Sequence, residues 1–553
     1  MKKKTMPSQK WQKTLFCCIS PLGSAYLLRK AMRKRPASRD ATLERCDGRM
    51  TANNDRNNPK MACFCIGDGR TGDMVQTGEA LSAADQEPTP LPPGAQDLHD
   101  TFKWHEVFLK EIRDMGMEET FRDNLRGSTI VASSVFSGIE CHKVAFAQLL
   151  HAAQLGSLQH YSACDCDPEC RQVIRNGHGV ARTQHIFADV LDRLPRPVWQ
   201  SCERMVKNQL SEYEVRRAEG DAHGAIVAEV GQRLLHDLFN HISAQHLLQR
   251  GWCVADGQRA VWARVRPKTS VGELEFHFAG FPCTSWGTRG KMFDLLHMST
   301  VPLATVLVDI TQNPVDIGIY ECTPRFASSG ISDIEAVAAT YHIQKVFTSP
   351  TDFGHPHRRR RCFMVFVNKK RRAVLGDIGD FHKKCMRQVV ASGTMYFCAG
   401  DDLVLAAKSS QAKKRCRSMQ LPWEMLLTPS ESIRLRELKA ECLRRYGTAR
   451  GVITMLDQNA SHESSGTTMP CLTRNCQPWS FSHGRVLVAH EHLVVQGFPV
   501  FPDLQERCGA EMPFDAHVIS PFRLKAMAGN GQSAVCMGFL ISWALAFTTK
   551  VHE

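Results

Sequence analysis

Short apolar runs rich in β-branched residues alternate with helix-like stretches from Ser128 onward. The predicted strands are Thr129–Phe136, Gln159–Ala163, Leu274–Phe281, Asp316–Tyr320, Ile343–Phe347 and Arg361–Val367. Segments such as Lys143–Ala153 and Pro168–Asn176 have helical patterns between them. This alternation predicts an α/β fold with a doubly wound, mostly parallel sheet. Ligands bind such sheets beyond the carboxyl ends of the strands, so functional residues are expected just after each strand.

The composition is that of an ordinary globular protein. Of the 553 residues, 43% are apolar and 23% are charged, which suits two or three folded domains. The longest apolar stretch, Val535–Phe547, is too short to cross a bilayer comfortably, so no membrane partner is expected. The 22 cysteines have no framework of spacings, which indicates a reducing compartment.

Positive charge is concentrated in two blocks. The net charge is +13; residues 1–40 contain eleven Lys and Arg against one acid, and residues 366–450 contain eighteen against eight. Such blocks suit a polyanion, with solvated surface as the alternative. Residues 1–40 also fit an organelle-targeting leader, a nuclear signal or a disordered arm. The polar segment 48–98 predicts a disordered linker, and the fold is expected to begin near Thr101.

Three strand ends carry residues suited to a nucleoside cofactor. Phe136-Ser137-Gly138 ends the first strand, and Gly138 permits a tight turn beside a cofactor, although many ordinary turns contain glycine. Asp165 follows the second strand, where an acid is placed to bind ribose hydroxyls. Asp189 adds a further acid, near the end of a third strand.

Cys283 follows a strand and begins a loop that contains Gly287, Gly290 and Lys291. A thiolate exposed there could act as a nucleophile, whereas a lone Pro-Cys pair is usually structural.

Other ligand-type residues carry less weight. Cys164, Cys166 and Cys170 have no partner pair at zinc-finger spacing, so no metal site is predicted. His490 and His492 are predicted to be surface residues of a helix.

The order of these motifs resembles that of the DNA cytosine-5 methyltransferases. Gly280-Phe281-Pro282-Cys283 resembles the catalytic loop of that family, and Phe136-Ser137-Gly138 resembles its cofactor motif. The other matching residues are Asp165, Asp189, Glu321 in Ile319-Tyr320-Glu321-Cys322, Arg359 and Arg361 of the arginine motif, Arg485, Glu491, Gln496-Gly497-Phe498-Pro499 and Asn530. Each motif alone is weak, but so many in order, from about Ser128 to Phe547, are specific.

The resemblance implies a Rossmann-like methyltransferase fold, S-adenosylmethionine as the methyl donor and DNA as the partner. Cys283 would add to C6 of a flipped cytosine, so that C5 becomes reactive toward the methyl group. Glu321 would neutralise charge at N3, while Arg359 and Arg361 would orient the thiol and the carboxyl group. The implied cofactor-binding residues are Phe136, Ser137, Gly138, Asp165, Asp189 and Asn530.

The resemblance also divides the chain. Residues 1–100 would form the arm and linker, and 101–367 the catalytic domain with a helical insertion at 199–263. Residues 368–480 would form a smaller basic target recognition domain, where the second basic block lies, and 481–553 would return to the catalytic domain. The nucleus is the expected location in a eukaryote, with organelle targeting as an alternative, and the cytoplasm otherwise.

Four positions depart from the family pattern. Glu140 replaces a common glycine, Thr284 and His357 replace glutamine, and Cys322 replaces asparagine. The departures leave the thiol, the carboxyl group and both arginines in place, but put full activity and the usual substrate in question. Two alternatives therefore stay open: an RNA cytosine-5 methyltransferase on the same fold, and a catalytically silent nucleic-acid-binding protein.

Overall fold

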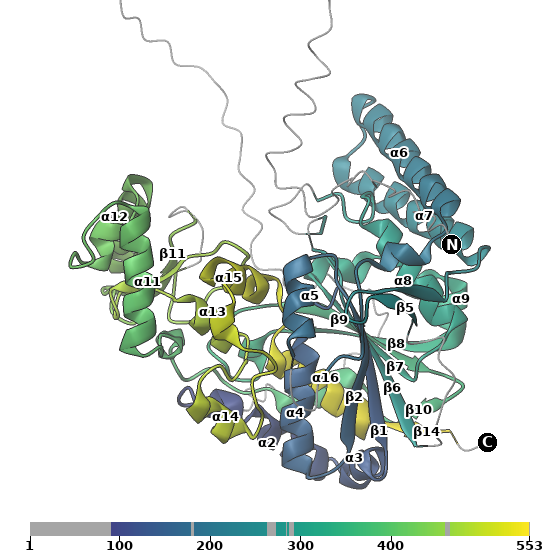
Figure 1. Cartoon of the computed structure of the whole chain (residues 1–553), viewed down its shortest axis with the longest axis horizontal. Coiled ribbons are helices and arrows are strands. Elements are labelled where there is room, and N and C mark those ends of the chain that lie inside the picture. The colour runs from purple at the N-terminus through teal and green to yellow at the C-terminus, as the bar shows by residue number, and fades with distance from the viewer. Residues whose placement is uncertain are drawn as a thin grey trace, which may run out of the picture. The chain divides into compact units, whose positions relative to one another are not determined.

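All six predicted strands form, and they belong to one nine-stranded sheet (Figure 1). The computed structural model describes residues 90–177, 182–262, 272–283, 285–286, 292–458 and 465–551. Within it, Leu91–Glu553 is one compact unit. The strands are β1 (Thr129–Val135), β2 (Ser157–Cys164), β3 (His185–Phe187), β4 (Arg250–Cys253), β5 (Gln258–Val261), β6 (Glu273–Gly280), β7 (Ile317–Cys322), β8 (Tyr341–Thr348) and β9 (Arg361–Asn368).

The sheet order is β5-β4-β3-β2-β1-β6-β7-β9-β8. Neighbours from β3 to β7 pair in parallel, whereas β9 runs antiparallel to both β7 and β8, and β4 runs antiparallel to both β3 and β5. The chain order reverses between β1 and β6, which makes their carboxyl ends the switch point where doubly wound sheets bind ligands. The predicted doubly wound, mostly parallel α/β fold is confirmed.

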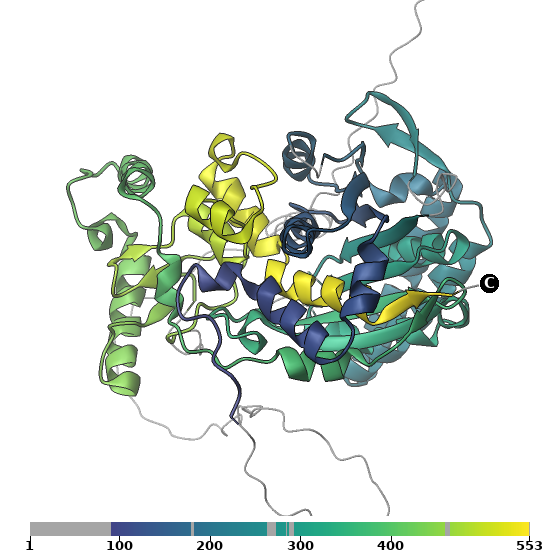
Figure 2. The same ribbon diagram turned by 90° about the horizontal axis from the view of Figure 1, so that it is seen from below.

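Helices cover both faces of the sheet. One apolar cluster joins the sheet to α6 (Arg196–Ala218), α7 (His223–Ser243), α8 (Thr300–Gln312) and α9 (Glu335–Thr340). The cluster on the opposite face joins it to α2 (Trp104–Asp114), α3 (Glu118–Leu125), α4 (Cys141–Ala153), α10 (Ile378–Cys385) and α16 (Ala534–Ala546). Figure 2 shows the yellow α16 beside the dark blue α2 and α3, so the end of the chain completes a layer begun near its start.

The predicted helical insertion is helical only in its first two thirds. After α6 and α7, the strands β4 and β5 form an antiparallel hairpin that extends the sheet. Its packing explains the difference, because the Trp262 ring stacks on Phe187 of β3 with centroids 3.8 Å apart. Aromatic contacts of this kind come from distant residues and override a local helical pattern.

Two predicted boundaries shift. Residues 91–98, assigned to the linker, are packed: Gly94 donates to the Gln388 carbonyl at 2.8 Å and lies against Gly354. Residues 372–385, assigned to the recognition segment, belong to the large core. There β10 (Arg372–Val374) pairs with β14 (Thr548–Lys550), and α10 joins the same apolar cluster as α16.

A smaller lobe follows, drawn in green at the left of Figure 1. It contains α11 (Asp401–Lys414), α12 (Pro429–Tyr446), β11 (Ile453–Met455), β12 (Pro478–Ser480) and β13 (Arg485–Val486). An apolar cluster of its own includes Trp423, Leu435 and Trp479. The chain then returns through α13 (Ala489–Val495), α14 (Pro502–Cys508) and α15 (Pro521–Asn530) to α16.

The prediction that His490 and His492 lie on a surface is wrong for His492, which is completely buried in α13. Burial lowers the pKa of His492 to about 3, and lowers the pKa values of His105 and His355 to about 4. These histidines are therefore neutral in the folded protein at neutral pH and gain a proton on unfolding in mild acid.

We expect the free energy of unfolding to fall as the pH drops below about 6.5, the ordinary histidine value. Because the folded pKa values are lowered, the stabilisation is complete above 6.5 and is lost between 6.5 and about 4 for His105 and His355, and between 6.5 and about 3 for His492. Each buried histidine should contribute a slope of up to about 1.4 kcal/mol per pH unit there. Urea denaturation at several pH values measures the slope, and His492→Gln should flatten it. An unchanged slope in that variant would contradict the assignment.

Candidate active site

The loop after β1 has an unusual backbone. Phe136, Gly138 and Glu140 all have positive φ angles, of 51°, 55° and 54°. Only glycine adopts such angles without strain, so two of the three positions need support from elsewhere. Ser137 supplies part of it, because its hydroxyl contacts both the amide and the carbonyl of Cys164 at the end of β2, each at 3.1 Å. The loop is thereby fixed between the two strands.

Asp165 completes this side of the switch point. Its carboxylate accepts hydrogen bonds from the amides of Gly138 and Asp167, both at 2.8 Å. Burial raises its pKa, and these two amides oppose the shift. Asp189 lies just after β3 and accepts from the Leu191 amide at 3.0 Å; burial raises its pKa too.

The space beside this loop suits a nucleoside cofactor. A Cβ added to Gly138 would meet no described atom within 4 Å, so one side of the loop is open. The Asp165 carboxylate binds the Gly138 amide there, and the half-buried ring of Phe136, two residues earlier in the loop, packs against Phe281. An apolar face beside a carboxylate acceptor fits an adenosine with free ribose hydroxyls.

The other side of the switch point carries the thiol and the glutamate. Cys283 is exposed three residues beyond β6, whose last residue, Gly280, pairs with Glu321 near the end of β7. A Cβ on Gly280 would lie 3.5 Å from the Phe136 carbonyl oxygen and 3.7 Å from Glu321 Oε2. The loop after β1, the glutamate and the strand leading to Cys283 therefore meet at one point.

Arg361, the first residue of β9, pairs with Glu321 through Nε and Oε1 at 2.9 Å. Burial lowers the pKa of Arg361, but its electrostatic interactions with Cys471, Glu321 and Cys283 outweigh burial, so the pKa is raised. Arg359 is also buried, and burial lowers its pKa. The structure pairs Arg361 with the glutamate and places Arg359 close enough for the charge of Glu321 to act on it.

The C-terminal segment is bound to the arginine motif through its backbone. Arg359 donates to the carbonyl oxygens of Gly529 at 3.3 Å and Gly531 at 2.5 Å, which flank the exposed Asn530. Gln496 donates to the Ala528 carbonyl at 2.8 Å. The last predicted cofactor residue is thus anchored by the arginine motif.

Arg485 and Glu491 lie at a distance from the Glu321–Arg361 pair. They form a buried two-bond pair at 2.8 and 2.9 Å, and Glu491 also accepts from the Ala399 amide at 2.8 Å. Their contacts join the smaller lobe to α13, which is a structural role.

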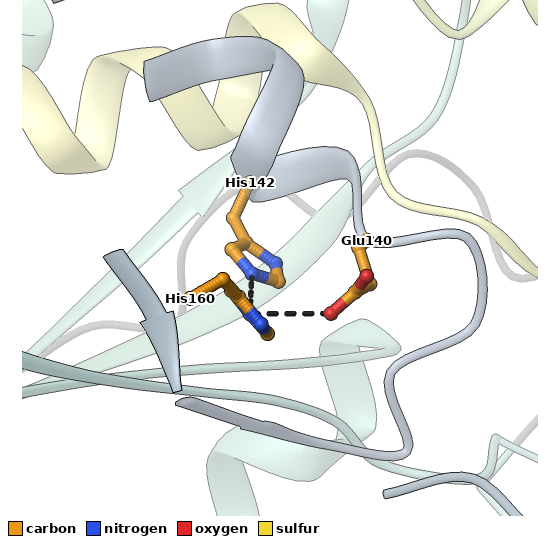
Figure 3. A group of neighbouring side chains, drawn as sticks. All are labelled: Glu140, His142 and His160. Atoms are coloured by element: carbon orange, nitrogen blue, oxygen red, sulfur yellow. Dashed lines mark hydrogen bonds and ion pairs between the residues drawn. The ribbon is translucent and has the colours of Figure 1, made fainter. Parts of the chain in front are cut away.

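Sequence reasoning missed a charged cluster at the loop after β1 (Figure 3). Glu140 is buried and forms an ion pair with Lys143 of α4, and its Oε1 lies 3.1 Å from His160 Nε2 on β2. Ser134 and Thr183 donate to the same carboxylate at 3.3 and 3.4 Å. Burial raises the pKa of Glu140 and lowers that of Lys143, while the contact between them opposes both shifts. The one signal of this cluster in the sequence is an acid at position 140 followed by a lysine three residues later.

The cluster also contains His142, whose Nε2 lies 2.9 Å from His160 Nε2 (Figure 3). Its ring stacks on Phe278, with centroids 4.3 Å apart. Two imidazoles and a carboxylate are metal-ligand types, and their ligand atoms lie close together. The Lys143 ammonium already supplies the positive charge that Glu140 requires, so the cluster is explained without a metal.

Some predicted features lie outside the described residues. They are Thr284, Gly287, Gly290 and Lys291 of the catalytic loop, and the basic arm and most of the linker within residues 1–89. Within the described ranges, no helix combines the length and apolar character needed to cross a membrane.

Several solved structures of methyltransferases resemble this chain. A DNA modification methyltransferase encoded within an E. coli prophage has 12% sequence identity and a TM-score of 0.38, and covers 75% of this chain and 98% of its own. The S. pombe Dnmt2 methyltransferase has 11% identity, a TM-score of 0.38 and coverages of 76% and 98%. The Entamoeba histolytica methyltransferase EhMeth has 10% identity, a TM-score of 0.35 and coverages of 75% and 98%. No family model and no curated protein matches the chain.

Proposed function

We propose that this protein is an S-adenosylmethionine-dependent DNA cytosine-5 methyltransferase with Cys283 as its nucleophile. The observation that carries the proposal is the Glu321–Arg361 pair at 2.9 Å, beside the loop of the exposed Cys283 and next to an open cofactor loop. A nucleophile, a carboxyl group and a fixed cation at one end of a nucleoside-type fold form a set suited to covalent activation of a base.

The residues have distinct roles in the proposed reaction. The Cys283 thiolate forms a bond to C6 of a flipped-out cytosine, and the electron pair displaced from the ring would collect at N3. Glu321 donates a proton at N3 and so neutralises the ring, while Arg361 holds the Glu321 carboxyl group in place. The cofactor supplies an electrophilic methyl group for C5. A base then takes the C5 proton, the electron pair left at C5 forms the C5–C6 double bond and expels Cys283 as a thiolate, and N3 returns its proton to Glu321.

Transfer of labelled methyl groups to duplex DNA and to transfer RNA, measured in parallel, tests the substrate. We expect 5-methylcytosine in DNA. Methylation of RNA alone would contradict DNA as the substrate, but would support the same reaction on cytosine in RNA. If neither polymer is methylated but nucleic acid is still bound, the result would support the alternative of a catalytically silent nucleic-acid-binding protein.

Asp165→Asn should weaken S-adenosylmethionine binding by about 1–3 kcal/mol, the scale of removing a hydrogen bond to a charged group. The carboxylate is the acceptor that flanks the open side of the loop. Isothermal titration calorimetry measures the change, and Asp167→Asn on the neighbouring helix cap is the matched control. Equal affinities in wild type and Asp165→Asn would place the ribose elsewhere.

We further propose that the basic face of the smaller lobe contacts DNA phosphates. Lys413, Lys414 and Arg417 are exposed at the end of α11, whereas Arg415 pairs with Glu431 at 3.6 Å and is left unchanged. Changing the three exposed cations to Gln should lower the log–log salt slope of DNA binding by about 0.9 for each phosphate that the protein no longer neutralises.

The matched control for this change is Arg122→Gln/Arg126→Gln on the exposed side of α3 and its C-terminal end. This control should leave the salt slope unchanged. A slope that is equal in all three proteins would locate the DNA surface outside α11.

A further inference from the structure

Cys471 lies at the centre of the site, although no motif pointed to it. It precedes β12, and its Sγ accepts from Nη1 of Arg359 and from Nη2 of Arg361, both at 3.9 Å. The thiol thus bridges the two guanidinium groups. No local pattern indicates this contact, because Cys471 and the arginines are more than 100 positions apart.

The charges around this point are otherwise unbalanced. The guanidinium group of Arg359 is buried and that of Arg361 is half-buried beside it, and Glu321 contacts Arg361. The side-chain contacts of Arg359 are to Cys471 and to the carbonyl oxygens of Leu472, Gly529 and Gly531, which carry no net charge. Its Nε is buried and has no hydrogen-bond partner among the described residues. A buried cation whose direct contacts are all uncharged is unfavourable by several kcal/mol, on the order of the desolvation penalty of an ion.

A thiolate at Cys471 would supply the missing anion. Burial raises the pKa of Cys471, but the charges of Arg359 and Arg361 outweigh burial, and the pKa is lowered. Other ionisable groups near it are Glu321 of β7, Cys283 of the catalytic loop and Cys476 of its own segment.

We propose that Cys471 is a second thiolate of this site, the counter-ion that positions Arg359 and Arg361 against Glu321. The inference rests on the proposed function, in which the two arginines need an anion while Glu321 is protonated. When the Glu321 carboxyl group holds the proton that it donates to N3, it no longer balances an arginine. Cys471 remains anionic at that stage and keeps both guanidinium groups in place. Cys471 acts through the arginines and is therefore a positioning residue.

The charge state of Cys471 can be measured without substrate. The ultraviolet absorption of thiolates is titrated in Cys283→Ala and in Cys283→Ala/Cys471→Ser, and the difference between the curves is the titration of Cys471. We expect a midpoint below the ordinary thiol value, and an upward shift of about one pH unit or more when Arg361→Gln is added. A midpoint at or above the ordinary value would overturn the proposal.

A second measurement needs no change at Cys471. Alkylation by iodoacetamide is followed in the native protein through the tryptic peptide 451–474, in which Cys471 is the one cysteine. The pH at half-maximal rate should rise in Arg361→Gln relative to wild type. An identical pH profile in the two proteins would show that the arginines do not stabilise a thiolate there.

Methyl transfer provides the functional readout. We expect Cys471→Ala to lower kcat by about 100-fold, with KM for DNA little changed, because misplaced groups affect the transition state most. Cys471→Asp, which restores an anion, should recover most of the activity, and the neighbouring buried Cys476→Ser is the matched control. No recovery in Cys471→Asp, together with unshifted thiol titrations, would refute the counter-ion role. If the wild-type protein transfers no methyl group, the proposed function fails, while the titrations still decide the charge of Cys471.

Discussion

Cys283→Ser should lower kcat for methyl transfer by about 1000-fold or more, on the order of 4 kcal/mol of transition-state stabilisation. A serine hydroxyl has nearly the volume of a thiol but is a far poorer nucleophile at neutral pH. Because the Cys283 side chain is exposed, folding and DNA binding should stay close to wild type. Steady-state kinetics with labelled cofactor, together with a thermal melt, measures both.

The exposed Cys416→Ser serves as the control thiol change and should retain wild-type turnover. DNA that contains 5-fluorocytosine gives an independent check, since fluorine at C5 blocks loss of the C5 substituent and traps the covalent intermediate. We expect a mass increase on the peptide of Cys283 in the wild type and none in Cys283→Ser. Substantial residual turnover of Cys283→Ser would remove this thiol from the mechanism.

Lys143→Met should lower the free energy of unfolding by about 3–5 kcal/mol, the usual effect of leaving one partner of a buried ion pair alone. Glu140 would then be a buried carboxylate whose remaining contacts, His160, Ser134 and Thr183, carry no compensating charge while the histidine is neutral. Glu140→Gln should also be destabilising, because it isolates the buried Lys143 ammonium.

The double variant Glu140→Gln/Lys143→Met should be much more stable than the sum of the single changes predicts, because neither charge remains. Chemical denaturation of the four proteins gives the coupling energy. The surface pair Glu203–Lys207, at 2.9 Å with a side chain of Lys207 that is 67% exposed, is the matched control and should couple by about 0.5 kcal/mol or less. A coupling as small as that of the surface pair would contradict a charged cluster beneath the cofactor loop.

The cluster also explains how the loop accommodates Glu140 at a position where the DNA cytosine-5 methyltransferases commonly have glycine. A glycine would adopt the φ of 54° without strain, whereas Glu140 needs compensation. The compensation comes from its side chain, which binds groups on β1, α4 and β2 and the residues before β3. The loop that we propose for the cofactor is therefore held by charge and hydrogen bonds, in addition to backbone geometry.

Local pattern was sufficient for the parts of the fold that depend on neighbours in sequence. The alternation of strands and helices, the strand-end positions of Gly138, Asp165 and Glu321, and the buried strands themselves all follow from side-chain periodicity and turn residues. The hairpin β4–β5, the packed segment 91–98 and the place of α10 were missed because each is stabilised by contacts with residues far along the chain.

The sequence by itself determined the doubly wound α/β fold and the ends of the strands where chemistry is expected, since both are set by patterns a few residues long. Only the tertiary structure decided which charges face one another. The pairing of Arg361 with Glu321, the Cys471 thiol between two arginines and the Glu140–Lys143 pair among two histidines depend on strand order and register. Electrostatic energies vary with distance and burial, and neither quantity is encoded in the local sequence.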